Sequence, residues 1–139
     1  MNFKLDSRLA DISVLAETID DLQIRLVNDS RYFWLMIVPT LPDIVEIDDL
    51  PTPCATRLFR LASNLSGWLK SKAKADKINN ALIGNVVPQL HLHIVARHKD
   101  DLHWPDPIWG RGVPVSLAKD TLELRIKEIK VFSANWSMT

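Results

Sequence analysis

A single long amphipathic helix between strand-like segments is the feature that most restricts how this 139-residue chain can fold. Its predicted start is Thr52-Pro53, a capping residue followed by a proline, which the first helical turn accommodates. The helix ends in the lysine-rich stretch 70–77, where cations suit the carboxyl end of a helix. Between these limits the apolar residues recur at spacings of three and four and form one stripe: Ala55, Leu58, Ala62, Leu65 and Leu69. One long helix among strands favours an α+β fold over repeated βαβ units.

The segments on either side of this helix are typical of strands. Residues 22–26 alternate apolar and polar side chains, which predicts a half-buried strand, and residues 33–38 form an apolar run expected of a strand buried on both faces. After the helix, residues 78–83 predict a short strand and residues 86–97 a longer one, separated by a turn at Gly84-Asn85. We therefore expect an antiparallel sheet of about five strands.

The last part of the chain predicts a loop and then a helix. Residues 100–114 contain three prolines and predict an irregular loop. Ser116 is the expected cap of a C-terminal helix whose apolar residues share one face. The chain contains no repeat, low-complexity tract or flexible linker, so we expect one domain over residues 1–139. The predicted fold is α+β, an antiparallel sheet with one long helix and a C-terminal helix.

Composition excludes some classes of partner and location. Seventeen Lys and Arg residues balance seventeen Asp and Glu residues, so no global field attracts nucleic acid or an anionic membrane. The longest apolar run, residues 33–38, is too short to span a bilayer, and residues 1–12 carry charges where a signal peptide has its apolar stretch. Cys54 is the only cysteine, so an internal disulfide is impossible. We expect a cytoplasmic protein without nucleic-acid or membrane partners.

The residues that carry chemistry are concentrated in segment 87–95, where polar and apolar side chains alternate. On a strand, Gln89, His91 and His93 point to one face, each about 6–7 Å from the next, with apolar residues on the other face. An unpaired buried polar group costs about 1–3 kcal/mol. Such groups side by side therefore require partners or an open site.

Residues 89–95, Gln-Leu-His-Leu-His-Ile-Val, resemble the His-Φ-His-Φ-His-Φ-Φ signature (Φ, apolar) of the histidine-triad superfamily of nucleotide hydrolases and transferases. The turn at Gly84-Asn85 and the order of the strands around the long helix are also similar to that family. The segment 104–110, Trp-Pro-Asp-Pro-Ile-Trp-Gly, resembles the tail of its bacterial hydrolase-like branch, which has a Gln-Φ-His-Φ-His motif.

The resemblance implies a covalent mechanism that needs neither a cofactor nor a metal. The middle residue of the triad, His91, attacks the α-phosphate of a nucleotide and forms a nucleotidyl-histidine, which water or another acceptor resolves. His93 donates hydrogen bonds to non-bridging oxygens or orients the leaving group. Gln89 replaces the first histidine of the family; its amide donates a hydrogen bond but does not exchange a proton near neutral pH, which affects rate and substrate range. The implied substrates are dinucleoside polyphosphates and nucleoside phosphoramidates.

The resemblance also implies residues that bind the nucleotide. In the family a polar residue at the end of an early strand holds the ribose hydroxyls, and Asp29 is the best match, with Asn28 beside it. An amide residue before the triad helps to hold the phosphate. Asn79 and Asn85 are the candidates for this position, and Asn80 stays open.

Five tryptophans are a high number for a chain of this length. Trp104 and Trp109 lie in the proline-rich loop, where large rigid side chains suit an interface or stacking on a base. The resemblance implies a homodimer in which the carboxy-terminal segment of one subunit approaches the nucleotide site of the other. Trp34 and Trp68 are instead expected in the core, and Arg97 is expected to be an ordinary charge at a strand end.

Two other interpretations stay open. The same fold and pocket can hold a mononucleotide without turnover, because the first histidine is absent. Alternatively, His91 and His93 bind a metal ion together with a third ligand. The candidates for that ligand are His98, His103, Asp100 and Asp101.

Overall fold

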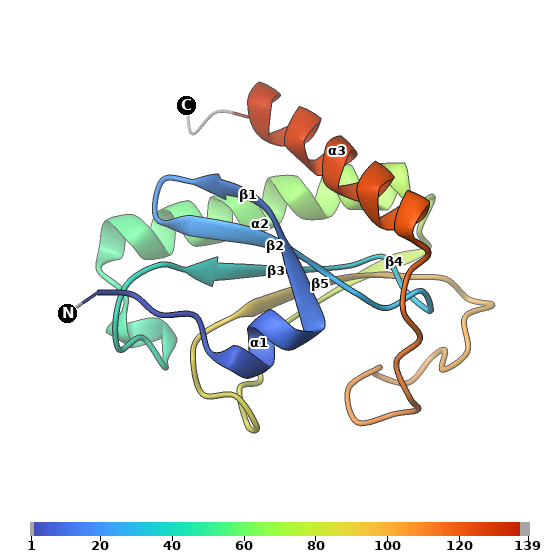
Figure 1. The fold of residues 1–139 in the computed structure, drawn as a ribbon, viewed down its shortest axis with the longest axis horizontal. Coiled ribbons are helices and arrows are strands. Elements are labelled where there is room, and N and C mark those ends of the chain that lie inside the picture. Colours follow the sequence, from blue (N-terminus) through green and yellow to red (C-terminus); the bar gives the residue numbers. More distant parts are fainter. Residues whose placement is uncertain (1, 137–139) are drawn as a thin grey trace.

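The computed structural model describes residues 2–136. Along the chain its elements are α1 (Ser7–Ile12), β1 (Ser13–Ile19), β2 (Leu22–Val27), β3 (Trp34–Pro39), the 3₁₀ helix η1 (Ile47–Asp49), α2 (Thr52–Lys72), β4 (Lys77–Ala81), β5 (Leu92–Arg97) and α3 (Lys119–Asn135). The five strands form one antiparallel sheet in the order β1-β2-β3-β5-β4. In Figure 1, α2 lies behind this sheet and α1 lies in front of it. The predicted α+β fold, with a long helix and a C-terminal helix, is confirmed.

The larger core lies between the sheet and the helices α2 and α3. The face of α2 that meets the sheet includes most of the predicted stripe, all 6% exposed or less: Leu58, Leu61, Ala62, Leu65 and Leu69. From α3, Ile129 is fully buried, and Phe132 packs against Trp68, one of the two tryptophans expected in the core. The predicted cap of α2 is wrong: Thr52 is the first helical residue, because Pro51 already has the extended ψ of a cap. Within residues 2–136, no helix is long and apolar enough to cross a membrane.

The central strand β3 is buried on both of its faces, as its apolar run predicts. Leu35 and Ile37 belong to the larger core on the helix side. Met36 and Val38 belong to a smaller cluster on the other side, where they pack with Leu9 of α1. The face of the sheet opposite α2 carries no long helix; α1 and the loop that follows β5 cover parts of it, and a site can form between them.

The predicted cap of the C-terminal helix, Ser116, is wrong. The helix begins at Lys119 and its cap position is Ala118. The reason is that the preceding residues are held in an extended strap along the sheet: Leu117 donates its backbone N–H to the Asn28 side chain at 2.8 Å. A helix cannot form until the chain has passed this attachment.

The last strand is shorter than the predicted segment 86–97. It begins at Leu92, because the chain before it bends: Gly84 has a φ of +65°, and the backbone N–H of Leu90 bonds the carbonyl of Ile44 at 3.0 Å. The alternation of a strand therefore does not extend back to Gln89, which has consequences for the site.

The elements α1 and β1 were not predicted from the sequence. Asp6 caps α1, and its carboxylate accepts the backbone N–H of Arg8 at 2.9 Å. β1 then pairs with β2 through a tight turn in which Asp20 has a φ of +52°. The amino-terminal segment, residues 2–12, thereby lies on the partly covered face of the sheet (Figure 1).

Candidate active site

His91 and His93 meet at the amino end of β5, on the face of the sheet opposite α2. Their rings are nearly perpendicular, with centroids 4.7 Å apart. They are 7% and 4% exposed. Both line a hollow of about 440 Å³ whose remaining walls are mostly apolar and include Trp34, Trp109 and residues of α1. The predicted pair of histidines thus shares one cavity.

The ring of His91 is held in one orientation by its own chain. Its Nδ1 lies 2.7 Å from the backbone carbonyl oxygen of Gln89. A carbonyl only accepts, so in the neutral ring Nδ1 carries the proton and Nε2 carries the lone pair. An imidazole held in this way presents a nucleophilic nitrogen in a fixed direction.

The ring of His93 is held in the opposite tautomer. The indole N–H of Trp34 donates to Nδ1 of His93 at 3.0 Å. An indole nitrogen is only a donor, so Nδ1 carries the lone pair and Nε2 carries the proton. Burial lowers the pKa of His93 to about 3, and the charge of His91 contributes in the same direction. His93 is therefore a neutral hydrogen-bond donor near pH 7, beside a neighbour with a free lone pair.

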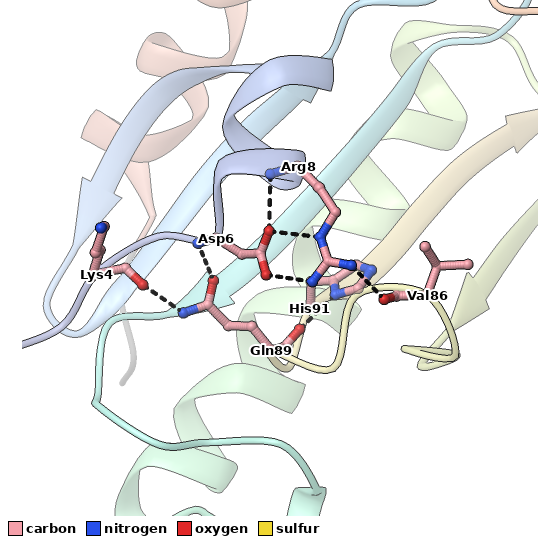
Figure 2. Close-up of polar contacts among 6 residues, drawn as sticks. All are labelled: Lys4, Asp6, Arg8, Val86, Gln89 and His91. Carbon is pink, nitrogen blue, oxygen red and sulfur yellow. Dashed lines mark hydrogen bonds and ion pairs between the residues drawn. The ribbon is translucent and has the colours of Figure 1, made fainter.

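The side chain of Gln89 does not stand in a row with the two histidines, and the expectation of three polar groups on one strand face is wrong. Gln89 precedes β5, so the strand alternation does not apply to it. Its amide instead contacts the amino-terminal segment: Nε2 donates to the carbonyl of Lys4 at 2.9 Å, and Oε1 accepts the N–H of Asp6 at 2.8 Å (Figure 2). Only the backbone carbonyl of Gln89 serves His91.

The amino-terminal segment forms one wall of the hollow, through Arg8, Leu9 and Ile12. Sequence reasoning missed these residues, because residues 1–12 show no motif and their charges served only to argue against a signal peptide. Hydrogen bonds from Arg8 lower the pKa of the Asp6 carboxyl to about 2, and the charge of His91 has a smaller effect in the same direction. Asp6 is therefore a permanent anion near His91.

The residues predicted to bind ribose do not line this hollow in the structure. Asp29 is 1% exposed and accepts three hydrogen-bonding groups of Arg31: the backbone N–H, Nε and Nη2. The side chain of Asn28 accepts the N–H of Leu117. Both side chains therefore hold the turn after β2 and the strap before α3.

The candidate phosphate-binding amides are divided between two places. Asn85 lines the hollow with His91 and His93. Asn79, on β4, accepts a hydrogen bond from Nη1 of Arg97 at 2.9 Å, and Asn80 donates to the hydroxyl of Ser66 at 3.1 Å. Of the three, the structure brings only Asn85 to the histidines.

Of the tryptophans, Trp34 lies in a place other than the predicted one. Trp34, expected in the core, lines the hollow and bonds His93, and Trp109 lies 5.2 Å from the His93 ring between centroids. Trp104 lies outside the hollow, with its ring 5.6 Å from the guanidinium of Arg97. The sequence signal for Trp109 was its place in the proline-rich loop. No pattern marked Trp34, since the run 33–38 is apolar throughout.

Arg97 and the possible third metal ligands form a separate network. Arg97 is 1% exposed and pairs with the carboxylate of Asp101, so it is a buried structural group. The ring of His103 bonds the hydroxyl of Tyr32, and Nε2 of His98 lies 2.9 Å from a backbone carbonyl. Among residues 2–136, no three side chains of the kinds that bind metals gather in one place. Of the candidate third ligands, His98, His103 and Asp101 are therefore engaged in other contacts.

The chain is similar to proteins of one family. Residues 12–100 match the HIT domain. A histidine triad protein from Bradyrhizobium japonicum is 35% identical, with a TM-score of 0.91 over 94% of this chain and 98% of that one. A histidine triad protein from Marinobacter aquaeolei is 31% identical, with a TM-score of 0.94 over 99% of this chain and 100% of that one.

A bis(5'-adenosyl)-triphosphatase from Saccharomyces cerevisiae is 33% identical over an alignment of 70 residues, and the match covers 47% of this chain. The match covers only 34% of the length of the yeast protein. The domain match spans more than half of the chain, and it includes β5 and both histidines. From its sequence and its fold alike, this chain belongs to the HIT family.

Proposed function

We propose that the protein is a nucleotidyl hydrolase or transferase in which His91 attacks the α-phosphate of a nucleotide. The observation that carries the proposal is the held ring of His91, whose Nδ1 is bound to the Gln89 carbonyl while Nε2 is left for attack in the hollow. Fixing the direction of a nucleophile supplies much of the rate of a displacement reaction.

The reaction proceeds in two displacements at phosphorus. First, the Nε2 lone pair forms a bond to the α-phosphorus, and the bond to the leaving group breaks with its electron pair on the leaving group. The nucleotidyl imidazolium keeps its proton on Nδ1, where the Gln89 carbonyl stabilises the positive charge. Second, a water or another acceptor attacks the phosphorus, the N–P bond breaks, and the electron pair returns to Nε2 while the acceptor releases its proton to the solvent.

His93 acts by hydrogen bonding and not by proton transfer. His93 lines the same hollow as His91, and its Nε2–H is the donor available to a non-bridging oxygen, on which charge accumulates in the transition state. A pKa of about 3 leaves almost no protonated imidazole near pH 7, so His93 has no proton to give to a leaving group. Asn85, which also lines the hollow, is the second hydrogen-bond donor available to the phosphate.

The walls of the hollow suit the base of a nucleotide. Trp34 and Trp109 present indole rings at 89° to each other, with centroids 6.4 Å apart, and Leu9 and Ile12 add aliphatic surface. A purine has two flat faces that such walls accommodate. Dinucleoside polyphosphates and nucleoside phosphoramidates are the proposed substrate classes, and the name of the yeast relative agrees with the first of them.

We further propose that the protein works in the cytoplasm as a homodimer, with neither cofactor nor metal. The support is the family, together with Trp104 and the C-terminal helix, which lie beyond the domain match. A monomer mass in light scattering at working protein concentration refutes the homodimer.

A nucleotide-binding module without turnover is the second candidate function. The observation that favours it is the side chain of Gln89, which bonds the backbone at residues 4 and 6 and contributes nothing to the hollow. The first position of the triad is thus absent from the chemistry, and only an activity measurement separates the two functions.

The test is a time course of AMP release from an adenosine phosphoramidate and from diadenosine tetraphosphate, with wild type, His91→Ala and His98→Gln. We expect His91→Ala to lose activity by orders of magnitude, because the nucleophile is removed. His98 lies outside the hollow, so His98→Gln retains activity and controls for general effects of losing an imidazole. If wild type binds AMP but releases none from either compound, the binding module is the correct function.

A further inference from the structure

The two hydrogen bonds of the Gln89 amide attach the amino-terminal segment next to the nucleophile (Figure 2). They join residue 89 to backbone groups of Lys4 and Asp6, which are 85 and 83 positions away in the sequence. The same residue holds the His91 ring through its carbonyl. Gln89 therefore couples the position of the nucleophile to the position of the amino-terminal segment.

The attached segment places one guanidinium beside the hollow. The Asp6 carboxylate accepts Nε of Arg8 at 3.1 Å and Nη2 at 2.9 Å, and Nη1 of Arg8 donates to the carbonyl of Val86 at 2.9 Å. Figure 2 shows this group between α1 and the loop that leads to His91. Three of the five guanidinium N–H groups are thereby used, which leaves one on each terminal nitrogen for a ligand.

Arg8 is the only permanently charged side chain among the described residues that line the hollow. The other polar side-chain groups there are the two imidazoles, the amide of Asn85 and the indole N–H groups of Trp34 and Trp109. The side chain of Arg8 is 53% exposed, so a bound ligand can reach it without displacing other parts of the protein. Its ion pair with Asp6 limits the motion of the guanidinium, which lowers the entropy lost when it binds an anion.

We propose that Arg8 binds the phosphate that leaves when His91 attacks, and so makes the protein selective for nucleoside polyphosphates. The inference rests on the proposed function of His91. When a P–O–P bond breaks, negative charge develops on the departing phosphate oxygen, and a guanidinium fork matches that group in charge and shape. When a P–N bond of a phosphoramidate breaks, the nitrogen takes a proton from solvent and leaves as an amine without negative charge, so Arg8 has nothing to stabilise.

Two variants of the same ion pair separate this role from a structural one. Arg8→Gln removes the cation. Asp6→Asn removes the anion but keeps the cap of α1, because an asparagine side chain also accepts a backbone N–H at that position. Both variants break the ion pair, so a purely structural role predicts the same effect for both, whereas phosphate binding by Arg8 predicts different effects.

The first measurement compares binding of AMP and ATP, without divalent metal, in a His91→Ala background that prevents turnover. We expect Arg8→Gln to weaken the binding of ATP by about 10- to 100-fold more than the binding of AMP, which is the usual loss for a charge-assisted hydrogen bond. We expect Asp6→Asn to keep the preference for ATP or to increase it, because it removes a negative charge next to the bound phosphates. Equal losses in the two variants, or equal losses for the two nucleotides, overturn the proposal.

The second measurement compares kcat/KM for diadenosine tetraphosphate and for an adenosine phosphoramidate in the wild-type background. Arg8→Gln is expected to lower the ratio of kcat/KM for diadenosine tetraphosphate to kcat/KM for the phosphoramidate by at least about tenfold. If wild type turns over neither compound, the hydrolase function fails, and the comparison of AMP with ATP still decides whether Arg8 binds the second phosphate. If the protein binds neither nucleotide, both proposals are wrong.

Discussion

Lowering the pH should destabilise this protein through His93, by an amount that follows from its burial. Burial and the charge of His91 lower the pKa of His93 from an ordinary 6.5 to about 3. Between these two values the unfolded chain binds a proton that the folded protein does not bind. The contribution of His93 to the free energy of unfolding is therefore fully present above pH 6.5 and decreases as the pH falls toward 3. From pH 7.5 to pH 5.0 the loss amounts to about 2 kcal/mol.

The assay is urea unfolding at several pH values between 7.5 and 5.0, at one protein concentration, for wild type and His93→Asn. The asparagine does not titrate, and its amide oxygen can accept the indole N–H of Trp34 in place of Nδ1. We expect wild type to lose about 2 kcal/mol more than the variant over this range, whatever the other titrating groups contribute. The comparison between the two proteins isolates the contribution of residue 93.

Parallel pH dependences for wild type and variant would refute the reasoning. They would mean that His93 takes up a proton in the folded protein about as readily as in the unfolded one. The role of His93 as a permanently neutral donor to the phosphate would then be wrong, and proton transfer by His93 would have to be considered.

The remaining predictions concern two residues that hold the histidines or their surroundings. Trp34→Phe removes the donor to His93 Nδ1 and keeps an aromatic ring, so we expect a change of the His93 tautomer in ¹⁵N spectra. We also expect kcat to fall by about tenfold or more with little change in KM. An unchanged tautomer contradicts this role of Trp34. Gln89→Met removes two hydrogen bonds to residues 4 and 6, worth about 1–2 kcal/mol together, so amide hydrogen exchange at residues 4–8 should accelerate. If Gln89→Met instead abolishes AMP release as fully as His91→Ala while exchange is unchanged, the amide acts in the chemistry and not on the segment.

The parts of the fold that could be predicted are those with a local period. The stripe of α2 and the apolar run of β3 were both identified, because burial of one helix face or of both strand faces imposes its spacing on neighbouring residues. The ends of these elements were less predictable. Thr52 and Ser116 are reasonable caps by composition, but the ψ of Pro51 and the attachment of Leu117 to Asn28 decide where the helices begin.

The candidate site was predictable only where its residues adjoin in the chain. His91 and His93 were placed together because they are two positions apart, and the structure brings their rings to 4.7 Å. The assignment of Gln89 to the same face failed because it assumed that the strand extends through residue 89. Trp34 was assigned to the core because an apolar run does not show which of its side chains will meet a polar partner.

The sequence by itself therefore determined the α+β class, the long helix and the two histidines, since each depends on spacing within a few residues. Only the tertiary structure decided how the histidines are used. Trp34 meets His93 across 59 positions of sequence, and Gln89 meets Asp6 across 83. The physical reason is that a hydrogen bond between distant residues imposes no period on the chain around either partner. The tautomer of His93 and the placement of Arg8 both follow from such bonds.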